Sequence, residues 1–202
     1  VEEGGRPGKS LNLGTVITCA LLAIFVVIIV LLGDYNLGVM WAAIAGIVTG
    51  VIIGFTSDYY TSDNTNPVKY TAKVSTSGSA INIITGLSYG LVSVVPSIVG
   101  IVAATVISFY TAEAAGISGV YGVGIAAVGL LSVSGMIVSS DAYGPIVDNA
   151  RGIAEMAGMN EDVIEKCDVL DSAGNTAKAI TKGFAISAAA LTVLALFAAY
   201  SE

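Results

Sequence analysis

Four charged residues in the second half of the sequence have types and spacings suited to binding a metal ion and an anion. Asp141 and Asp148 are seven residues apart, which is two helical turns, so their carboxylates share one helix face. Lys178 and Lys182 are four residues apart and also share a face. Carboxylate oxygens suit divalent cations, and lysine ammonium groups bind phosphate as point charges. The pattern predicts a site for a phosphate–magnesium complex.

The residues just before the two lysines are typical of the start of a helix. Asn175 and Thr176 follow Gly174, and either Ser172 or Asn175 suits a helix N-terminus. Backbone amides at a helix start favour anions, so we expect this N-terminus to help bind the phosphate. In the acidic segment, Pro145 lies between the two aspartates and removes a helical hydrogen bond, which loosens the backbone there.

The elements that must position these residues are long apolar helices. Hydrophobic residues make up 55% of the chain, charged residues 11%, and the mean hydropathy is +0.85. A helix needs about 20 apolar residues to cross a membrane. We therefore expect an all-α polytopic membrane protein, with residues 1–202 forming a single transmembrane helical domain. The expected spans are about 11–32, 37–55, 92–110, 117–140 and 177–200, and the fourth helix extends into the cytoplasm to about residue 157.

The connections between these spans differ in length and polarity. Asn66-Pro67 predicts the start of an amphipathic cytoplasmic helix that leads into the apolar stretch 80–110, where Pro96 predicts a kink. A continuous helix from about 120 to 157 would be roughly 57 Å long. The segment 159–168 is expected to be a charged connection. A face for close helix packing is predicted in the second span by three glycines at four-residue spacing, namely Gly46, Gly50 and Gly54.

Every lysine and arginine can be placed on one side of the membrane. Basic residues next to membrane spans stay in the cytoplasm. The connections 33–37 and 112–118 and the tail after residue 200 contain no base, and they carry Asp34, Glu113 and Glu202. We therefore expect the N-terminus inside, the C-terminus outside, and the polar site facing the cytoplasm. The basic residues are Arg6, Lys9, Lys69, Lys73, Arg151, Lys166, Lys178 and Lys182.

Several classes of site and partner are not expected from this sequence. Histidine is absent and the two cysteines form no cluster, which argues against zinc, haem and iron–sulfur centres. No Walker A, nucleophile-elbow or HExxH motif occurs, and no nucleic-acid partner is expected. One alternative function is a non-enzymatic secondary ion transporter or channel that uses Asp141 and Asp148 as ion sites. Another is a structural membrane scaffold, which would leave the polar motifs unexplained.

Three long segments resemble the membrane-integral, ion-pumping inorganic pyrophosphatases. They are DAYGPIVDNARGIAEMA (141–157), DVLDSAGNTAKAITKGFAIS (168–187) and DYYTSDNTNPVKYTAKVSTSGSAINIITGL (58–87). In the last of these, Asp58 stands where glutamate is common in the family. The resemblance covers most of residues 55–200, whereas residues 1–54 match only in character.

The resemblance implies a bundle of about sixteen transmembrane helices that forms a homodimer. This chain would supply the eighth to twelfth helices, and the first residue, valine, also suggests a piece of a longer polypeptide. The implied activity is hydrolysis of pyrophosphate, with Mg²⁺ as cofactor, coupled to proton translocation out of the cytoplasm. By position, Asp148 and Asn175 would bind magnesium. Asp141 would match a family acid that lies one step deeper in the membrane and belongs to the same magnesium site, and Lys182 would lie near the substrate.

Lys178 and Thr181 form a pair that carries a further implication of the resemblance. Potassium-dependent family members have alanine at the position of Lys178, whereas potassium-independent members have lysine with threonine three residues on. The resemblance therefore implies that potassium is not required, because a tethered ammonium replaces a diffusible cation. It also favours protons over sodium as the pumped ion.

The resemblance also indicates what this chain lacks. The lysine- and aspartate-rich motif of the fifth and sixth helices is missing, as is the acid set of the fifteenth and sixteenth. Those helices would carry most of the magnesium ligands, the acids that orient the attacking water, and the ion gate. We therefore assign no catalytic residue within this chain, and the remaining helices of the same polypeptide are its expected partners, together with the lipid bilayer.

Overall fold

All regular structure in residues 5–201, the part of the chain described by the computed structural model, is helical. Two sequence-based arguments, on the valine at position 1 and on the acid at position 202, concern residues outside this range. The elements are α1 (Pro7–Leu32), α2 (Leu37–Thr61), α3 (Asn66–Val74), the short 3₁₀ helix η1 (Ser75–Ser77), α4 (Ser79–Ala114), α5 (Gly119–Leu131), α6 (Ser134–Met156) and α7 (Glu161–Ser201).

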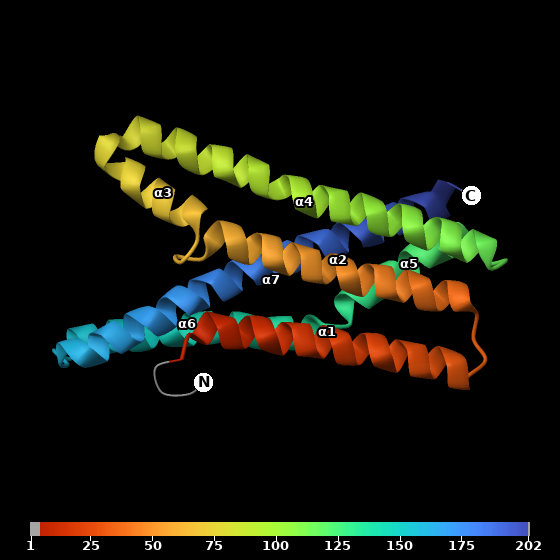
Figure 1. The fold of residues 1–202 in the computed structure, drawn as a ribbon, viewed down its shortest axis with the longest axis horizontal. Coiled ribbons are helices and arrows are strands. Elements are labelled where there is room, and N and C mark those ends of the chain that lie inside the picture. Colours follow the sequence, from red (N-terminus) through yellow and green to blue (C-terminus); the bar gives the residue numbers. More distant parts are fainter. Residues whose placement is uncertain (1–4, 202) are drawn as a thin grey trace.

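The long helices run side by side, so that successive connections alternate between the two ends of the molecule (Figure 1). The start of α1, the helix α3 and the α6–α7 connection lie at one end. The α1–α2 and α4–α5 connections and the C-terminal end of α7 lie at the other. The start of α1 and the helix α3, which carry Lys9, Lys69 and Lys73, therefore lie toward the same end of the bundle as the α6–α7 connection.

The number of spans agrees with the expectation of about five. Within the described residues, α1, α2, α4 and α7 are each long and apolar enough to cross a membrane, and the pair α5–α6 counts as a fifth span if its bend is accepted. Many large apolar side chains on α1 and α4 are exposed. Such a surface is typical of helices that face lipid or further helices. The chain is an all-α, polytopic integral membrane protein.

The expectation of one continuous helix from about 120 to 157 was wrong. The helix breaks between Leu131 and Ser134, and α5 and α6 meet at an angle of 41°. Val133 departs from helical geometry with φ −86° and ψ 0°. The hydroxyl of Ser132 turns back to the carbonyl of Gly129 at 2.6 Å. Serine and glycine residues are frequent at such kinks because they offer alternative hydrogen bonds and little steric restraint.

The expected start of the last helix was also wrong. α7 begins at Glu161, more than ten residues before Ser172, and runs for 41 residues without a break. The connection from α6 is therefore only residues 157–160, and Gly158 turns the chain there with φ +64°. Glu161 and Asp162 occupy the first turn of α7, where their charges favour the helix N-terminus. The segment 159–168, expected to be a connection, is mostly helical.

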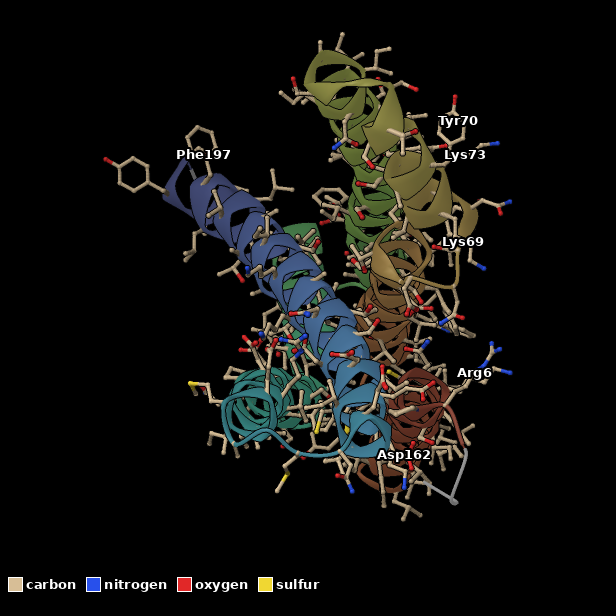
Figure 2. All side chains as sticks on the ribbon, turned by 90° about the vertical axis from the view of Figure 1, so that its left-hand side faces the viewer. Arg6, Lys69, Tyr70, Lys73, Asp162 and Phe197 are labelled. Atoms are coloured by element: carbon tan, nitrogen blue, oxygen red, sulfur yellow. The ribbon has the colours of Figure 1, made fainter. Side chains whose placement is uncertain are left out.

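The polar segment after the second span folds as predicted at its start. α3 begins at Asn66, with Pro67 in its first turn. Lys69, Tyr70 and Lys73 point away from the bundle (Figure 2), which makes the helix amphipathic. At Gly78, with φ +114°, the chain reverses into α4, which continues through Pro96 as a single helix.

The glycine face predicted in the second span packs against two other helices. A Cβ atom at Gly46 would overlap the carbonyl oxygen of Ala126 on α5. One at Gly50 would lie 2.7 Å from Cε1 of the Phe184 ring on α7, and Gly54 faces the same ring. Because only hydrogen fits at these contacts, α2 lies close to both helices. The core between them is built around buried residues that include Ile47, Leu130, Phe184 and Leu191.

Candidate functional site

The candidate site lies on the hairpin formed by α6 and α7, and two glycines set the distance between these helices. A Cβ atom at Gly174 would lie 2.9 Å from the Cα of Gly144 and 2.8 Å from Cγ2 of Val147. A Cβ atom at Gly144 would lie 2.9 Å from the carbonyl oxygen of Gly174. All three distances are shorter than those that real Cβ atoms show, so the two backbones touch here because neither residue has a side chain.

Next to this contact, four polar side chains form a continuous chain of interactions across the two helices. Lys178 Nζ lies 3.7 Å from Oδ2 of Asp148 on α6. The same ammonium group donates to Oδ1 of Asn175 at 3.3 Å. The amide nitrogen of Asn175 donates in turn to Oδ2 of Asp171 at 3.2 Å. Three residues that the sequence predicted to act together, Asp148, Asn175 and Lys178, are thus adjacent.

The close glycine contact also determines where Lys178 points. A Cβ atom at Gly144 would lie 2.5 Å from Cε of Lys178, so the lysine stem lies over the bare backbone of α6. Side chains on a helix lean toward its N-terminus, and this lean brings Nζ toward Asn175 and Asp148. The side chain of Lys178 is 26% exposed and that of Asp148 is 62% exposed. An ion pair with this much solvent exposure contributes little to stability. Its main effect is to place a positive and a negative charge at the surface of the hairpin.

Thr181, the second member of the potassium-independence pair, joins the same two helices one turn further along α7. Its hydroxyl lies 3.3 Å from the carbonyl oxygen of Ile137 on α6 and 3.1 Å from that of Ala177 on α7. The hydroxyl has one proton to donate, and the two carbonyls compete for it. Thr181 therefore fixes α7 against α6 next to Lys178, and it does not touch the lysine ammonium group.

The other two predicted site residues lie outside this chain of contacts. Among the described residues, neither Asp141 nor Lys182 takes part in an ion pair. Asp141 is half-buried on α6, two turns before Asp148, and Lys182 is exposed on α7, one turn after Lys178. The structure therefore groups Asp148, Asn175 and Lys178 and leaves Asp141 and Lys182 as separate polar positions on the same two helices.

One part of the sequence argument for this site was wrong. Asn175 and Thr176 were expected at a helix N-terminus, whose amides would bind an anion. Because α7 begins at Glu161, the amides of these residues belong to the interior of a helix and are used in its own hydrogen bonds. Thr176 is buried, and its hydroxyl lies 3.5 Å from the carbonyl oxygen of Thr61 at the end of α2. Anion binding at this site must come from side chains.

Asp171 is the residue that sequence reasoning missed. Its Oδ2 accepts the hydrogen bond from Asn175, while its Oδ1 is fully buried and has no hydrogen-bond partner among the described residues. The hydroxyl of Tyr143 on α6 reaches the same turn of α7, donating to the carbonyl of Leu170 at 3.3 Å. The available signal was the spacing: Asp171 precedes Asn175 by four residues and therefore shares its helix face.

A pair of salt bridges holds the hairpin closer to its turn. Arg151 on α6 donates to Asp168 on α7 at 2.7 Å and to Glu155 at 2.6 Å. The hydrogen bond to Asp168, followed by the negative charge of Glu155, raises the pKa of the Arg151 guanidinium. The two carboxylates are more than half exposed and Arg151 is half-buried, so the effect of these pairs on stability is small.

The oxygen atoms of this site suit a hard divalent cation, but the described residues supply only part of a coordination shell. No group of three histidine, cysteine, aspartate or glutamate side chains in the described part of the chain is close enough to hold a metal ion. Asp148 offers a carboxylate and Asn175 an amide oxygen, both of which are ligands that Mg²⁺ accepts. A complete site requires ligands from outside these seven helices.

The fold and this site together define a polytopic membrane protein that carries a cluster of carboxylate, amide and ammonium groups on one of its helical hairpins. The family model described as inorganic H⁺ pyrophosphatase matches residues 1–202, and the chain belongs to this family.

The curated relatives are all much longer than this chain. It is 44% identical over 198 residues to a protein of Clostridium tetani, a match that covers 97% of this chain and 29% of the relative. It is 41% identical to a protein of Caldanaerobacter subterraneus, covering 100% of this chain and 30% of the relative. A protein of Methanosarcina mazei is 42% identical, with 99% and 30% covered. The chain thus spans less than a third of the length of these relatives.

The names of these relatives agree on pyrophosphate and differ on the ion. The Clostridium tetani protein is provisionally named a K(+)-stimulated pyrophosphate-energized sodium pump. The proteins of Caldanaerobacter subterraneus and Methanosarcina mazei are named K(+)-insensitive pyrophosphate-energized proton pumps. Because the sequence identities to the two kinds of pump are almost the same, overall similarity does not distinguish between them. The distinction has to come from individual residues.

Proposed function

We propose that the intact protein hydrolyses inorganic pyrophosphate on the cytoplasmic side of a membrane and couples this reaction to the movement of protons out of the cytoplasm. Membership of the pyrophosphatase family supports the substrate. The single observation that carries the proposal for this chain is the meeting of Asp148, Asn175 and Lys178 across the α6–α7 hairpin. Together they offer two oxygen ligands and one fixed positive charge at a single place.

Each of these residues has a distinct role in the proposed reaction. Oδ1 and Oδ2 of Asp148 and Oδ1 of Asn175 are the atoms that would hold magnesium. Bound magnesium neutralises phosphate charge in phosphoryl transfer. The ammonium group of Lys178 attracts and orients the diphosphate, and Lys182 lies one turn further along the same helix.

The bond changes are those of a direct hydrolysis. The oxygen of a water molecule bonds to one phosphorus atom while the bond from that phosphorus to the bridging oxygen breaks. The bridging oxygen leaves on the second phosphate with the electron pair of that bond and takes up the proton that the water loses, so that two hydrogen phosphates form. No phosphoenzyme is formed. The acids that orient the water belong to other helices of the polypeptide, which, with this chain, would form a bundle of about sixteen helices and a homodimer.

Potassium independence is proposed from Lys178 and Thr181. A potassium ion beside the substrate supplies one positive charge, and the Lys178 ammonium supplies the same charge from a tethered position. Thr181 holds α7 against α6 one turn away from Lys178, which fixes the position of the lysine relative to α6. The names of the two K(+)-insensitive relatives are in keeping with this reading, and they favour protons as the pumped ion.

The alternative, a secondary ion transporter or channel based on Asp141 and Asp148, has weaker support. Such proteins usually place their ion sites near the bilayer midplane, on broken helices. Here the α5–α6 span is broken at Val133, but Asp148 lies fifteen residues past the break, toward the α6–α7 connection, and it is paired with a lysine. A site displaced toward one end suits chemistry on a soluble cytoplasmic substrate better than ion transfer.

The experiment that tests the proposal uses membranes that contain the full-length protein. Phosphate release from pyrophosphate is measured with and without added K⁺, and acidification of inverted vesicles is followed with a pH-sensitive dye. We expect phosphate release that does not require K⁺, together with acidification that a protonophore abolishes. Ion movement without phosphate release would support the transporter, and the absence of both would favour a scaffold.

A further inference from the structure

Asn175 can serve as a metal ligand only if its amide group points the correct way. The oxygen of the amide can bind a cation and the nitrogen cannot. An asparagine side chain can turn over and exchange these two atoms. A neighbouring group that holds the amide in one orientation before the cation arrives therefore favours metal binding.

The two neighbours of Asn175 on its helix face select the same orientation. Asp171, four residues earlier, is a carboxylate and can only accept, so the amide nitrogen must face it, and the distance from Nδ2 to Oδ2 is 3.2 Å. Lys178, three residues later, can only donate, so the amide oxygen must face it, and Nζ lies 3.3 Å from Oδ1. Turning the amide over would place nitrogen against ammonium and oxygen against carboxylate.

The surroundings of Asp171 strengthen its part of this arrangement. Its second oxygen, Oδ1, is fully buried without a hydrogen-bond partner among the described residues. A buried carboxylate oxygen without a partner is costly. Its position next to the predicted metal ligand points to a role other than stability. Arg151 forms its ion pairs with Glu155 and Asp168 and none with Asp171, and the hydrogen bond from Asn175 is the side-chain hydrogen bond that Asp171 accepts among the described residues.

We propose that Asp171 is a positioning residue, whose carboxylate holds the amide of Asn175 so that Oδ1 faces the metal-binding side, toward Lys178 and Asp148. The proposal rests on the magnesium role given to Asn175 in the proposed function. Partners that orient metal ligands commonly change metal affinity 10-fold to 100-fold when they are removed. Asp171 has this relation to Asn175, through a hydrogen bond along one helix face.

The test compares four variants of the full-length protein in detergent: Asp171→Leu, Asp171→Asn, Asn175→Asp and the exchange Asp171→Asn/Asn175→Asp. Asp171→Leu removes the acceptor. Asp171→Asn keeps an acceptor oxygen but also adds an amide that can turn. Asn175→Asp places two carboxylates together. The exchange restores one amide-to-carboxylate hydrogen bond with the partners reversed, so a metal-facing oxygen is again held in place.

The readouts are the Mg²⁺ concentration that gives half-maximal protection against thermal denaturation, and the Mg²⁺ dependence of pyrophosphate hydrolysis. We expect this concentration to rise about 10-fold or more in Asp171→Leu, to rise less in Asp171→Asn, and to be lower in the exchange variant than in Asn175→Asp alone. Asp162→Asn, at the exposed first turn of α7 (Figure 2), is the matched control and should leave it unchanged.

Two results would overturn the proposal. One is an unchanged Mg²⁺ requirement in Asp171→Leu. The other is an equal loss in Asp171→Asn and Asp171→Leu that the exchange does not reduce, because that would mean the charge of Asp171 acts on the metal directly. If the wild-type protein hydrolyses no pyrophosphate, the proposed function fails, whereas protection by Mg²⁺ alone still decides whether Asp171 orients Asn175.

Discussion

The ammonium nitrogen of Lys178 on α7 lies 3.7 Å from a carboxylate oxygen of Asp148 on α6. These two residues are thirty positions apart, and they meet because the α6–α7 hairpin brings two glycine backbones into contact beside them. The pair places a fixed positive charge beside an oxygen ligand suited to a divalent cation.

Replacing Lys178 by alanine should make hydrolysis depend on added potassium. The variant lacks the tethered charge, and a monovalent cation can take its place near the diphosphate. Pyrophosphate hydrolysis by membranes is measured over a range of K⁺ concentrations, with Na⁺ held constant. The exposed Lys166→Ala on the same helix is the control and should remain independent of potassium. Full activity of Lys178→Ala without K⁺ would contradict the assignment.

Replacing Asp148 by asparagine should raise the Mg²⁺ concentration needed for half-maximal hydrolysis by at least about tenfold, since loss of a direct ligand should cost no less than loss of a supporting residue. The substitution keeps the shape of the side chain and removes its charge. Asp34→Asn, in the connection after α1 at the opposite end of the molecule (Figure 1), should have no effect. An unaltered Mg²⁺ curve for Asp148→Asn excludes this residue as a ligand.

Replacing Gly144 by alanine should reduce hydrolysis about tenfold or more, although the residue has no functional group. A Cβ atom there would lie 2.5 Å from the stem of Lys178 and 2.9 Å from the backbone of α7. Because catalysis is sensitive to displacements of about 1 Å, moving the lysine and the helix should be costly.

The matched control is Gly152→Ala on the same helix, where a Cβ atom meets nothing within 4 Å. Alanine is also the better helix former, by about 1 kcal/mol. This control should keep its activity and gain slightly in stability. Equal activity of the two variants would show that the glycine contact does not position the site.

The sequence predicted about five spans, a number that the structure supports, because the hydropathy of a segment reports directly on its preference for the membrane. It did not predict the break at Val133, since no proline marks it. The local feature there is the hydrogen bond from the Ser132 hydroxyl to the carbonyl of Gly129, which the sequence does not reveal. It also misplaced the start of α7. The charged segment from Glu161 looked like a loop, but its acids favour a helix N-terminus and its other residues continue the helix.

For the candidate site, the sequence singled out Asp148, Asn175 and Lys178, which the structure places in contact with one another. It could not show that Asp141 and Lys182 lie outside the chain of contacts, because that depends on how two helices are rotated against each other. Nor could it show why Lys178 reaches Asp148. Lys178 reaches Asp148 because Gly144 has no side chain, which leaves room for the lysine stem where α6 and α7 touch.

The most direct test of the account is to locate the metal in the full-length protein. Crystals grown with Mn²⁺ in place of Mg²⁺ and with a non-hydrolysable bisphosphonate would reveal the metal by its anomalous scattering. We expect a metal ion bound to both Asp148 and Asn175 Oδ1 at about 2.0–2.2 Å, close to the distances of magnesium ligands, with the ammonium of Lys178 facing the bisphosphonate. A metal–bisphosphonate complex bound elsewhere, with these three side chains turned toward lipid, would contradict it.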